Sequence, residues 1–405
     1  MYNAIVIGGG VAGLFVAQHI RKNVLVLEKN NSLGQKLLVS GSGQCNFTHN
    51  GYIKEFFNKY GDKQNFVKKC LNAFSNQDSI RFFNDNGINS IITENGKVFP
   101  KSLNSEDILN ILIKLNRLNT LKTNIDIKKV TFLDDIFCIV DNNNNQYFSK
   151  NLVIATGGIT YPKLGASSFG YVIAKQFGHT IIEPRPALTN IISKQRAITT
   201  LAGISFKQLK IEIYRNNNKV LDCIGDLIIT HKGLSGPVIL DNSRNIKPND
   251  TLNINFLPKF NYESLHDKLV NDFHKFGSLK LLSYLKMFDL PKSLLEHFCE
   301  QLNISKNFCC AQIIKSHRKE LCKLLTMYPI EVDNLGGLNI AMVTHGGVCT
   351  KEIYSSTFES KIQKNLYFIG EVLDIDGNTG GYNIQFAFSS AFSSGRKIIE
   401  NSIHC

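Results

Sequence analysis

Between Leu37 and Asn50 the chain reads LLVSGSGQCNFTHN, in which a glycine-rich loop precedes Cys45 and His49. Three kinds of chemistry use such residues: a backbone cradle for phosphate, a reactive thiol, and half of a metal site. Cys45 has no second cysteine within ten residues, and no C-x-x-C pair occurs in the chain. Disulfide exchange needs a nearby partner thiol and a zinc site needs further ligands, so the stretch favours the cradle and we expect no metal site.

A second glycine-rich turn, Gly8-x-Gly10-x-x-Gly13, follows a short apolar run and precedes residues with helical spacing. In such a unit Gly8 permits the tight turn, Gly10 lets the backbone approach a pyrophosphate, and Gly13 lets helix and strand pack closely. Free N–H groups and the positive end of the helix dipole then face the phosphates. Glu28 ends the next strand and would accept hydrogen bonds from a ribose 2′-hydroxyl but repel a 2′-phosphate. The pattern predicts a dinucleotide site.

Two later features favour FAD over NAD as this dinucleotide. A glycine turn follows a strand at Ala155-Thr156-Gly157-Gly158, and the C-terminal part carries Gly370-Glu371 and then Gly380-Gly381. FAD needs a C-terminal segment that returns to its ribityl chain and ring, whereas a plain NAD dehydrogenase does not. A helix that begins near Asn383 would aim its N–H groups at the flavin pyrimidine, where negative charge develops on reduction. We therefore predict non-covalent FAD as the cofactor.

The elements that position these residues follow from the hydrophobic pattern. AIVIG and NVLVLEK read as buried strands, and LFVAQHIRK between them has helical spacing, which makes a βαβ unit. Residues 121–149 are typical of a β-meander, and 151–158 are again a buried strand that meets a glycine turn.

A chain of 405 residues is too long for one simple core. The pattern of apolar and polar residues also changes twice after Pro186. We predict a first part of the FAD-binding domain over 1–189, and its return segment over 335–405. Between them 190–334 would form an inserted substrate or cap domain. This insertion is expected to be β-rich over 190–260 and helical over 261–325, since the first stretch alternates apolar and polar residues and the second has helical spacing.

The composition of the chain limits which binding partners and which cellular compartment we expect. The formal net charge is +13, but the basic residues are scattered, so nucleic acid is not the expected partner on charge alone. No apolar run is long enough for a membrane span. The N-terminus enters a strand directly without a signal peptide, so we expect a cytoplasmic protein with mostly free thiols. The oligomeric state stays open.

Six motifs over nearly the whole chain resemble the bacterial FAD-dependent oxidoreductases of the BaiN/YhiN type, also called aminoacetone oxidase family FAD-binding enzymes. They are GGGVAG at 8–13, QKLLVSGSGQCNFTHN at 35–50, IATGGITYPKLGASSFGYVIAKQFGH at 154–179, THKGLSGPVIL at 230–240, THGGVCTKEI at 344–353 and YFIGEVLDIDGNTGGYNIQFAFSSAFSSG at 367–395.

The resemblance implies an α/β flavoprotein of the two-dinucleotide-binding-domain type. Its FAD-binding domain would be Rossmann-like and similar to glutathione reductase, with a parallel sheet plus a β-meander. The inserted substrate domain would be part antiparallel β and part helical. The chain departs from the family at Ser42 and Gln44, where a glycine and an arginine are usual, and at His345, where a small residue is usual. His345 is either a titratable group near the flavin or a tolerated loop substitution.

The predicted cofactor-binding residues come from six parts of the chain. Lys36 and Ser40 would reach the phosphates or ribose, while the resemblance places Cys45 and Asn46 along the middle of the cofactor. The full predicted set is Gly8, Gly9, Gly10, Ala12, Gly13, Glu28, Lys29, Lys36, Ser40, Gly41, Gly43, Cys45, Asn46, Val130, Ala155, Thr156, Gly157, Gly158, Gly370, Glu371, Asp374, Gly380, Gly381, Tyr382, Asn383 and Ile384.

Candidates for catalysis are fewer. His231 is an acid or base in one interpretation and a structural loop histidine in the other. Tyr382 and Asn383 are candidates from the resemblance and their position. Asp376 is either a polar contact to the cofactor or part of a solvated turn.

The predicted function is hydride transfer between FAD and a small organic substrate. NAD(P)H would bind transiently as electron donor, because no second strand–GxGxxG–helix unit occurs. Two alternatives stay open: a flavin oxidase of a small amine or aminoketone, and, from another class, an RNA-associated flavoprotein.

Overall fold

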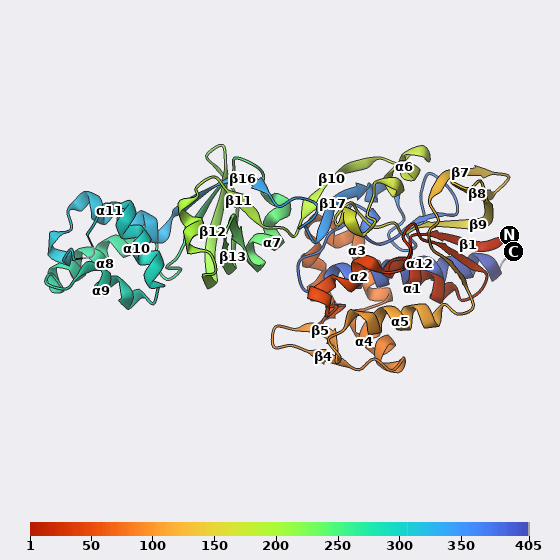
Figure 1. The fold of residues 1–405 in the computed structure, drawn as a ribbon, viewed down its shortest axis with the longest axis horizontal. Helices are drawn as coiled ribbons and strands as arrows, with labels where there is room; N and C mark the ends of the chain where they lie inside the picture. Colours follow the sequence, from red (N-terminus) through yellow and green to blue (C-terminus); the bar gives the residue numbers. More distant parts are fainter. Residues whose placement is uncertain (306, 404–405) are drawn as a thin grey trace. The chain divides into compact units, whose positions relative to one another are not determined.

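The computed structural model describes residues 1–305 and 307–403, which form two compact units (Figure 1). The first unit comprises Met1–Ala187 together with the chain from Leu338 onward, and the second comprises Leu188–Gly337. Each has its own buried apolar cluster.

A seven-stranded sheet is the centre of the first unit, in the order β6-β2-β1-β9-β8-β7, with β18 also paired to β9. The strands β6, β2, β1, β9 and β18 run parallel, and β7, β8 and β9 form an antiparallel meander. Their bounds are β1 Tyr2–Ile7, β2 Val24–Leu27, β6 Thr120–Lys122, β7 Ile127–Leu133, β8 Ile136–Asp141, β9 Gln146–Ile154 and β18 Leu366–Phe368.

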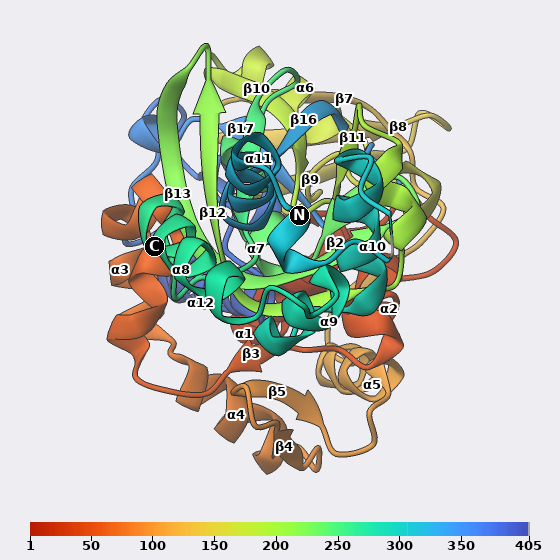
Figure 2. The ribbon, with the colours of Figure 1, turned by 90° about the vertical axis from the view of Figure 1, so that its left-hand side faces the viewer.

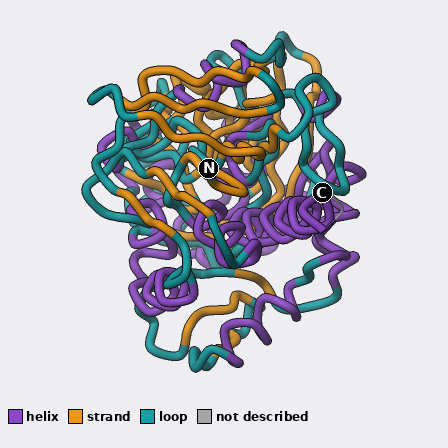
Figure 3. The backbone as a smooth tube through the Cα atoms, turned by 90° about the vertical axis from the view of Figure 1, so that its right-hand side faces the viewer, coloured by secondary structure: helices purple, strands orange, loops and turns teal. Residues whose placement is uncertain are grey.

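Helices and two small sheets complete the first unit. The small sheets pair β3 Thr48–His49 with β5 Lys97–Pro100 and β4 Ser90–Ile92, and β10 Ile181–Ala187 with β17 Val343–Val348. The helices are α1 Val11–Ile20, α2 Gln35–Leu38, α3 Gln64–Ala73, α4 Asn76–Asp85, α5 Ser105–Leu115, α6 Phe169–Gln176 and α12 Tyr382–Ile403. Figure 3 shows α12 as the long helix beside the C-terminus.

An aromatic cluster packs α1 against α12. The Phe15 ring lies 4.9 Å from Phe388 and 5.2 Å from Phe74, centroid to centroid, and Phe15 and Phe388 are fully buried. Such pairs contribute about 0.5–1.5 kcal/mol beyond the burial of their apolar area. The start of α12 is thereby held beside the glycine turn that precedes α1.

The second unit is built from a closed barrel and a group of helices. The barrel strands follow the order β11-β14-β13-β12-β15-β16, and Figure 2 shows β12 and β13 as long neighbouring strands. The strands are β11 Ile191–Ser193, β12 Ser205–Arg215, β13 Asn218–Thr230, β14 Gly233–Ser235, β15 Thr251–Asn255 and β16 Tyr328–Leu335. The helices are α7 Pro237–Asn242, α8 Tyr262–Lys275, α9 Leu281–Leu285, α10 Lys292–Gln301 and α11 Lys315–Thr326.

The predicted fold class is confirmed: a Rossmann-like α/β unit with a parallel sheet and a β-meander, joined to a part that is antiparallel β and helical. The unit boundaries at Ala187/Leu188 and Gly337/Leu338 lie two or three residues from those expected. The assignment of substrate binding to the second unit stays a prediction.

Two glycines fix how β1 turns into α1. Gly8 has φ +109°, which a residue with a side chain rarely adopts. A Cβ on Gly13 would collide with the carbonyl oxygen of Gly8, so α1 can begin directly above the end of β1 only because Gly13 has no side chain.

We expect Gly13→Ala to destabilise the cofactor-free protein by about 1–3 kcal/mol, the usual range for overpacking a tight contact. Thermal unfolding of the apoprotein measures this effect. Gly10→Ala is the matched control, since a Cβ at Gly10 meets no atom within 4 Å and should change the unfolding temperature little. Equal unfolding temperatures for Gly13→Ala and wild type would contradict the steric argument.

Candidate functional site

The turn before α1 leaves an open, donor-rich space. Gly10 is the N-cap residue of α1, and no side chain caps the helix there. A Cβ added to Gly10 would meet no protein atom within 4 Å, although the surrounding turn is tightly packed. Because uncapped N–H groups and the helix dipole attract anions, this space fits the pyrophosphate of a dinucleotide.

Glu28 holds the turn from the neighbouring strand. Its two carboxylate oxygens accept hydrogen bonds from the backbone N–H groups of Gly9, at 2.7 Å, and Asn30, at 2.9 Å. Each oxygen keeps a further lone pair for a ligand hydroxyl. Glu28 therefore shapes the turn as well as offering the ribose contact that its position predicts.

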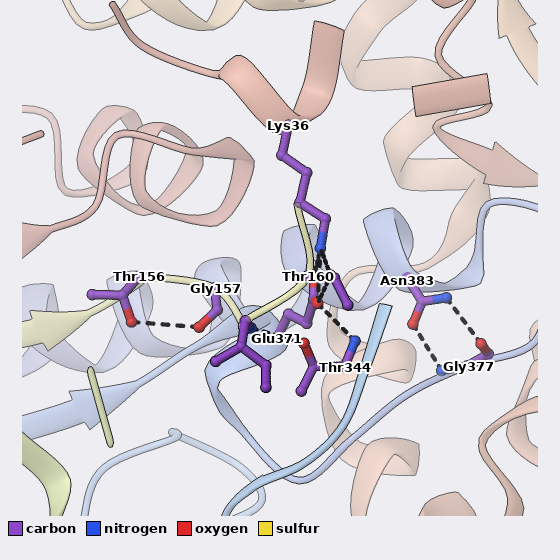
Figure 4. A network of polar contacts seen from close by, with 9 residues as sticks. Lys36, Thr156, Gly157, Thr160, Thr344, Glu371, Gly377 and Asn383 are labelled. Atoms are coloured by element: carbon purple, nitrogen blue, oxygen red, sulfur yellow. Dashed lines mark hydrogen bonds and ion pairs between the residues drawn. The ribbon is translucent and has the colours of Figure 1, made fainter. Parts of the chain in front are cut away.

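An ion pair joins α2 to the segment that follows β18 (Figure 4). The Lys36 ammonium group donates to both carboxylate oxygens of Glu371, at 2.8 and 2.7 Å, and to Thr160 Oγ1 at 2.7 Å. The same carboxylate accepts from the backbone N–H of Thr344 at 2.9 Å. Gly158 lies against this cluster, where a Cβ would collide with Thr344. Four separate segments thus meet at one carboxylate.

Tyr161 belongs to the same neighbourhood. The Lys36 ammonium lies 5.8 Å from the centre of the Tyr161 ring, within the range of a cation–π contact. Burial, assisted by the negative charge of Glu371, raises the pKa of the Tyr161 hydroxyl, so this group stays protonated at neutral pH.

A side chain of α12, Asn383, holds the loop that precedes this helix. The Asn383 side chain accepts from the backbone N–H of Gly377 at 2.8 Å and donates to its carbonyl oxygen at 2.9 Å (Figure 4). Gly380 and Gly381 have φ values of +118° and +92°, so the backbone can turn sharply into the helix. The side chain of Asn383 therefore positions the glycine turn.

Tyr382 packs at the same helix start. Its ring stacks on His49 with centroids 5.3 Å apart, and its carbonyl oxygen accepts a hydrogen bond from Tyr60. Both ring nitrogens of His49 lie within 3.0 Å of backbone carbonyl oxygens, of Asn50 and Asn95. The histidine of the opening motif thus supports the turn before α12.

Cys45 differs from its predicted role along the cofactor. Its side chain is fully buried in the apolar core, and burial raises the pKa of its thiol to about 12. Cys45 therefore exposes no surface to a cofactor and holds no thiolate at neutral pH. Val130 is also buried, with its carbonyl oxygen accepting from Gln176.

Asp374 is likewise engaged within the protein. Its carboxylate lies 2.8 Å from the Lys63 ammonium, and its side chain is 6% exposed. Burial alone would lower the pKa of Lys63, but hydrogen bonds with Asp374 and Asp62 outweigh it and raise the pKa. This pair ties the segment before α3 to the loop before α12, and a direct cofactor contact by Asp374 stays a prediction.

The structure brings the remaining predicted residues together in part. Ala12 packs close to Gly370, and Gly8 lies against Ala155. The Ser40 hydroxyl donates to the Leu37 carbonyl oxygen, and the Asn46 amide donates to two carbonyl oxygens. Lys29, Gly41, Gly43, Thr156, Gly157 and Ile384 keep at least partial exposure in the first unit.

His231 is the exception among the site candidates. It lies exposed in the turn between β13 and β14 of the second unit, whereas Tyr382 and Asn383 belong to the first. Sequence reasoning missed Thr160, Thr344 and the ion pair between Lys36 and Glu371, because their partners are 27 to 335 positions away and no local spacing marks them.

Neither a metal cluster nor a membrane span occurs in the part of the chain that the structure describes. Among these residues no group of three or more His, Cys, Asp and Glu side chains could hold a metal ion. No helix in the described ranges is both long and apolar enough to cross a membrane.

Comparisons with known proteins agree with the fold. The family model described as HI0933-like protein Rossmann domain matches residues 2–397. A Haemophilus influenzae relative named ribosomal RNA dihydrouridine synthase is 34% identical over 96% of each chain. A Clostridium scindens relative named 3-dehydro-bile acid delta(4,6)-reductase is 25% identical over 98% of each chain. A variant of E. coli quinol fumarate reductase FrdA has a TM-score of 0.50 at 13% identity, over 99% of this chain and 70% of that chain.

The Rossmann-like unit and its open, glycine-lined cradle define an FAD-binding flavoprotein fold, and the class is that of the FAD-dependent oxidoreductases. The chain belongs to the HI0933-like family, as the BaiN/YhiN resemblance predicts. FAD is the cofactor that this family and the residues around Gly10 fit. The individual contacts to FAD stay proposals.

We expect Gly10→Val to remove bound FAD while leaving the apoprotein folded, because the new side chain would enter the space of the pyrophosphate and its Cβ would meet no protein atom within 4 Å. FAD released on denaturation and circular dichroism measure the two properties. Gly337→Val is the control and should keep FAD, since a Cβ added to Gly337 would also meet no atom within 4 Å. Full FAD content in Gly10→Val would refute the cradle.

We expect Lys36→Met to lower the stability of the apoprotein by about 1.5–3 kcal/mol, because it leaves the half-buried Glu371 carboxylate without its cation. Lys36→Met combined with Glu371→Leu should recover part of this loss, since no unpaired charge remains. Thermal melts of the four proteins in the cycle measure the coupling. Strict additivity would show that the pair does not join the segments energetically.

Proposed function

We propose that this flavoprotein reduces a carbon–carbon double bond conjugated with a carbonyl group, and that its substrate is a uridine base in ribosomal RNA. The observation that carries the proposal is the open, uncapped turn at Gly10 within a chain that matches a named ribosomal RNA dihydrouridine synthase over nearly its whole length. The sequence motifs alone favour a small molecule, whereas the name of this relative favours RNA.

The type of bond follows from chemistry that two relatives share by name. A dihydrouridine synthase reduces the C5–C6 double bond of uracil, which is conjugated with the C4 carbonyl. A reductase of a 3-dehydro-bile acid, with the positions given in its name, acts on carbon–carbon bonds conjugated with a ketone. Reduction of the uracil double bond adds hydride to the β-carbon, C6, and a proton to the α-carbon, C5.

Bound FAD supplies the hydride, and the protein supplies binding, orientation and electrostatics. The side chains around the cradle suit this division. Lys36 and Glu371 neutralise one another, and α12 begins at Tyr382 with the positive end of its helix dipole. A dithiol relay through Cys45 is disfavoured, because this thiol is buried and forms no disulfide.

NAD(P)H is the proposed electron donor. The second unit consists of an antiparallel barrel and helices rather than another βαβ unit, so a nicotinamide would bind transiently. The net charge of +13 is compatible with a polyanionic substrate, but the basic residues are scattered and the charge alone does not select RNA.

The reductase is tested with ribosomal RNA from cells that lack dihydrouridine in it. We expect the purified FAD-loaded protein with NADH or NADPH to increase the mass of one uridine by two hydrogens, as read by mass spectrometry of nuclease digests. Activity should fall steeply with added salt, because RNA binding releases counterions. Gly10→Val protein, expected to lack FAD, is the control.

Two other outcomes discriminate the alternatives. If the protein reduces a small conjugated ketone and leaves RNA unchanged, the proposed type of reaction stands, but its substrate is a small molecule rather than RNA. Rapid peroxide production from a small amine or aminoketone, with neither conjugated substrate reduced, would make the protein an oxidase.

A further inference from the structure

We propose that His345, oriented by Asp376, donates the proton that completes the reduction. The inference rests on the proposed function and adds to it a residue for the second half of the reaction. It assigns a role to a histidine that differs from the residue usual at this place in the family.

The two side chains form a hydrogen-bonded pair. His345 Nδ1 lies 2.7 Å from Asp376 Oδ1. The carboxyl side chain is 5% exposed and the imidazole 22% exposed. A buried carboxylate that accepts the Nδ1 proton fixes the orientation of the ring. In the doubly protonated form of the ring, Nε2 also carries a proton, and this is the proton that can leave.

The other ring nitrogen of His345, Nε2, is not engaged by this pair. It has no hydrogen-bond partner among the described residues, and it is not among the buried polar atoms that lack one. The nitrogen is therefore available to a ligand or to water. This arrangement of a buried acid, an oriented imidazole and an accessible nitrogen is the geometry that a general acid needs.

The other described histidines of the first unit lack this geometry. His179 is fully buried and lies within hydrogen-bond or ion-pair distance of Ser360 and Glu352. His49 has both nitrogens near backbone carbonyl oxygens. His19 packs on Phe392, and burial, with the positive charge of Arg21, lowers its pKa.

The place of the pair connects it with the proposed flavin contacts. His345 follows Thr344, whose N–H binds Glu371, and Gly346 and Gly347 have φ values of +93° and +133°. Asp376 lies in the loop that leads to Gly380. The pair therefore joins two segments that border the Lys36–Glu371 cluster and the turn before α12.

Charged groups lie near the imidazole on both β10 and the segment that follows β18. Arg185 lies opposite His345 in the register of β10 and β17. On the segment that follows β18, Glu371 is paired with Lys36 and Asp374 with Lys63. Asp376 is thus the carboxylate in contact with His345.

The proposed step conserves atoms and electrons. Hydride adds to the β-carbon, which is C6 in uracil, and the π electron pair moves toward the α-carbon and its carbonyl group. The Nε2–H bond of the doubly protonated ring breaks, a C–H bond forms at the α-carbon, which is C5, and the ring is left neutral. A solvent proton then returns to Nε2, and NAD(P)H supplies the two electrons for the next cycle.

The test compares His345→Gln and Asp376→Asn with His274→Gln, a substitution in α8 that serves as the matched control. In single turnovers of prereduced enzyme we expect uridine reduction to slow about 100-fold in His345→Gln, about tenfold in Asp376→Asn, and not in His274→Gln. Flavin reduction by NAD(P)H should stay within about twofold of wild type in all three, because it needs no proton from His345.

Two further readouts separate proton donation from a structural role. In D2O the wild-type product should carry deuterium on one face of C5, whereas His345→Gln should give both faces. In the apoprotein, diethylpyrocarbonate should modify His345 several-fold faster than His179, whose side chain is buried, or His49, whose two ring nitrogens both lie near carbonyl oxygens.

The outcomes are distinct for the two proposals. Wild-type rate and stereochemistry in His345→Gln, or a resistant His345 in the apoprotein, would overturn proton donation and leave the reductase standing. Loss of reduction in His231→Gln with full rate in His345→Gln would assign the proton to the other histidine. A wild-type protein that reduces neither RNA nor a conjugated ketone would overturn the proposed function and the role of His345 with it.

Discussion

The close contact between Gly8 and Gly13 is the constraint on which the first unit depends. Because neither residue has a side chain, β1 can turn directly into α1 and leave the helix N-terminus uncapped. The parallel strands β2 and β9 pair with β1 and carry Glu28 and the turn at Gly157 to the same edge of the sheet. Glu28 and the turn that follows β9 therefore lie beside that uncapped helix start.

The C-terminal segment completes the site by electrostatics rather than by sheet pairing alone. The strand β18 pairs with β9, and Glu371, which follows β18, binds Lys36 of α2. Asp374 binds Lys63, and Asp376 binds His345, so three acidic residues of one loop each hold a cation or an imidazole from elsewhere in the unit. These pairs explain why a loop of mixed apolar and acidic residues can be largely buried: each carboxylate has a partner.

The sequence predicted the fold well where local patterns decide it. Apolar periodicity and glycine turns marked β1, α1, β2 and the meander. The change in the pattern of apolar and polar residues near residue 190 marked the start of the second unit. Contacts between distant segments were beyond it, since Thr160 and Thr344 carry no local signal. The burial of the Cys45 side chain was missed for a related reason: spacing along the motif does not reveal that this side chain turns into the core.

In the proposed reaction, flavin electrons pass to a conjugated double bond in RNA. Anaerobic stopped-flow mixing of prereduced protein with ribosomal RNA that lacks dihydrouridine, followed by the flavin absorbance, measures this transfer. We expect reoxidation at a rate that rises with RNA concentration, and no reoxidation by RNA in which the uridine is already reduced. Reoxidation by oxygen alone, with the flavin unchanged by either RNA, would contradict electron transfer to RNA.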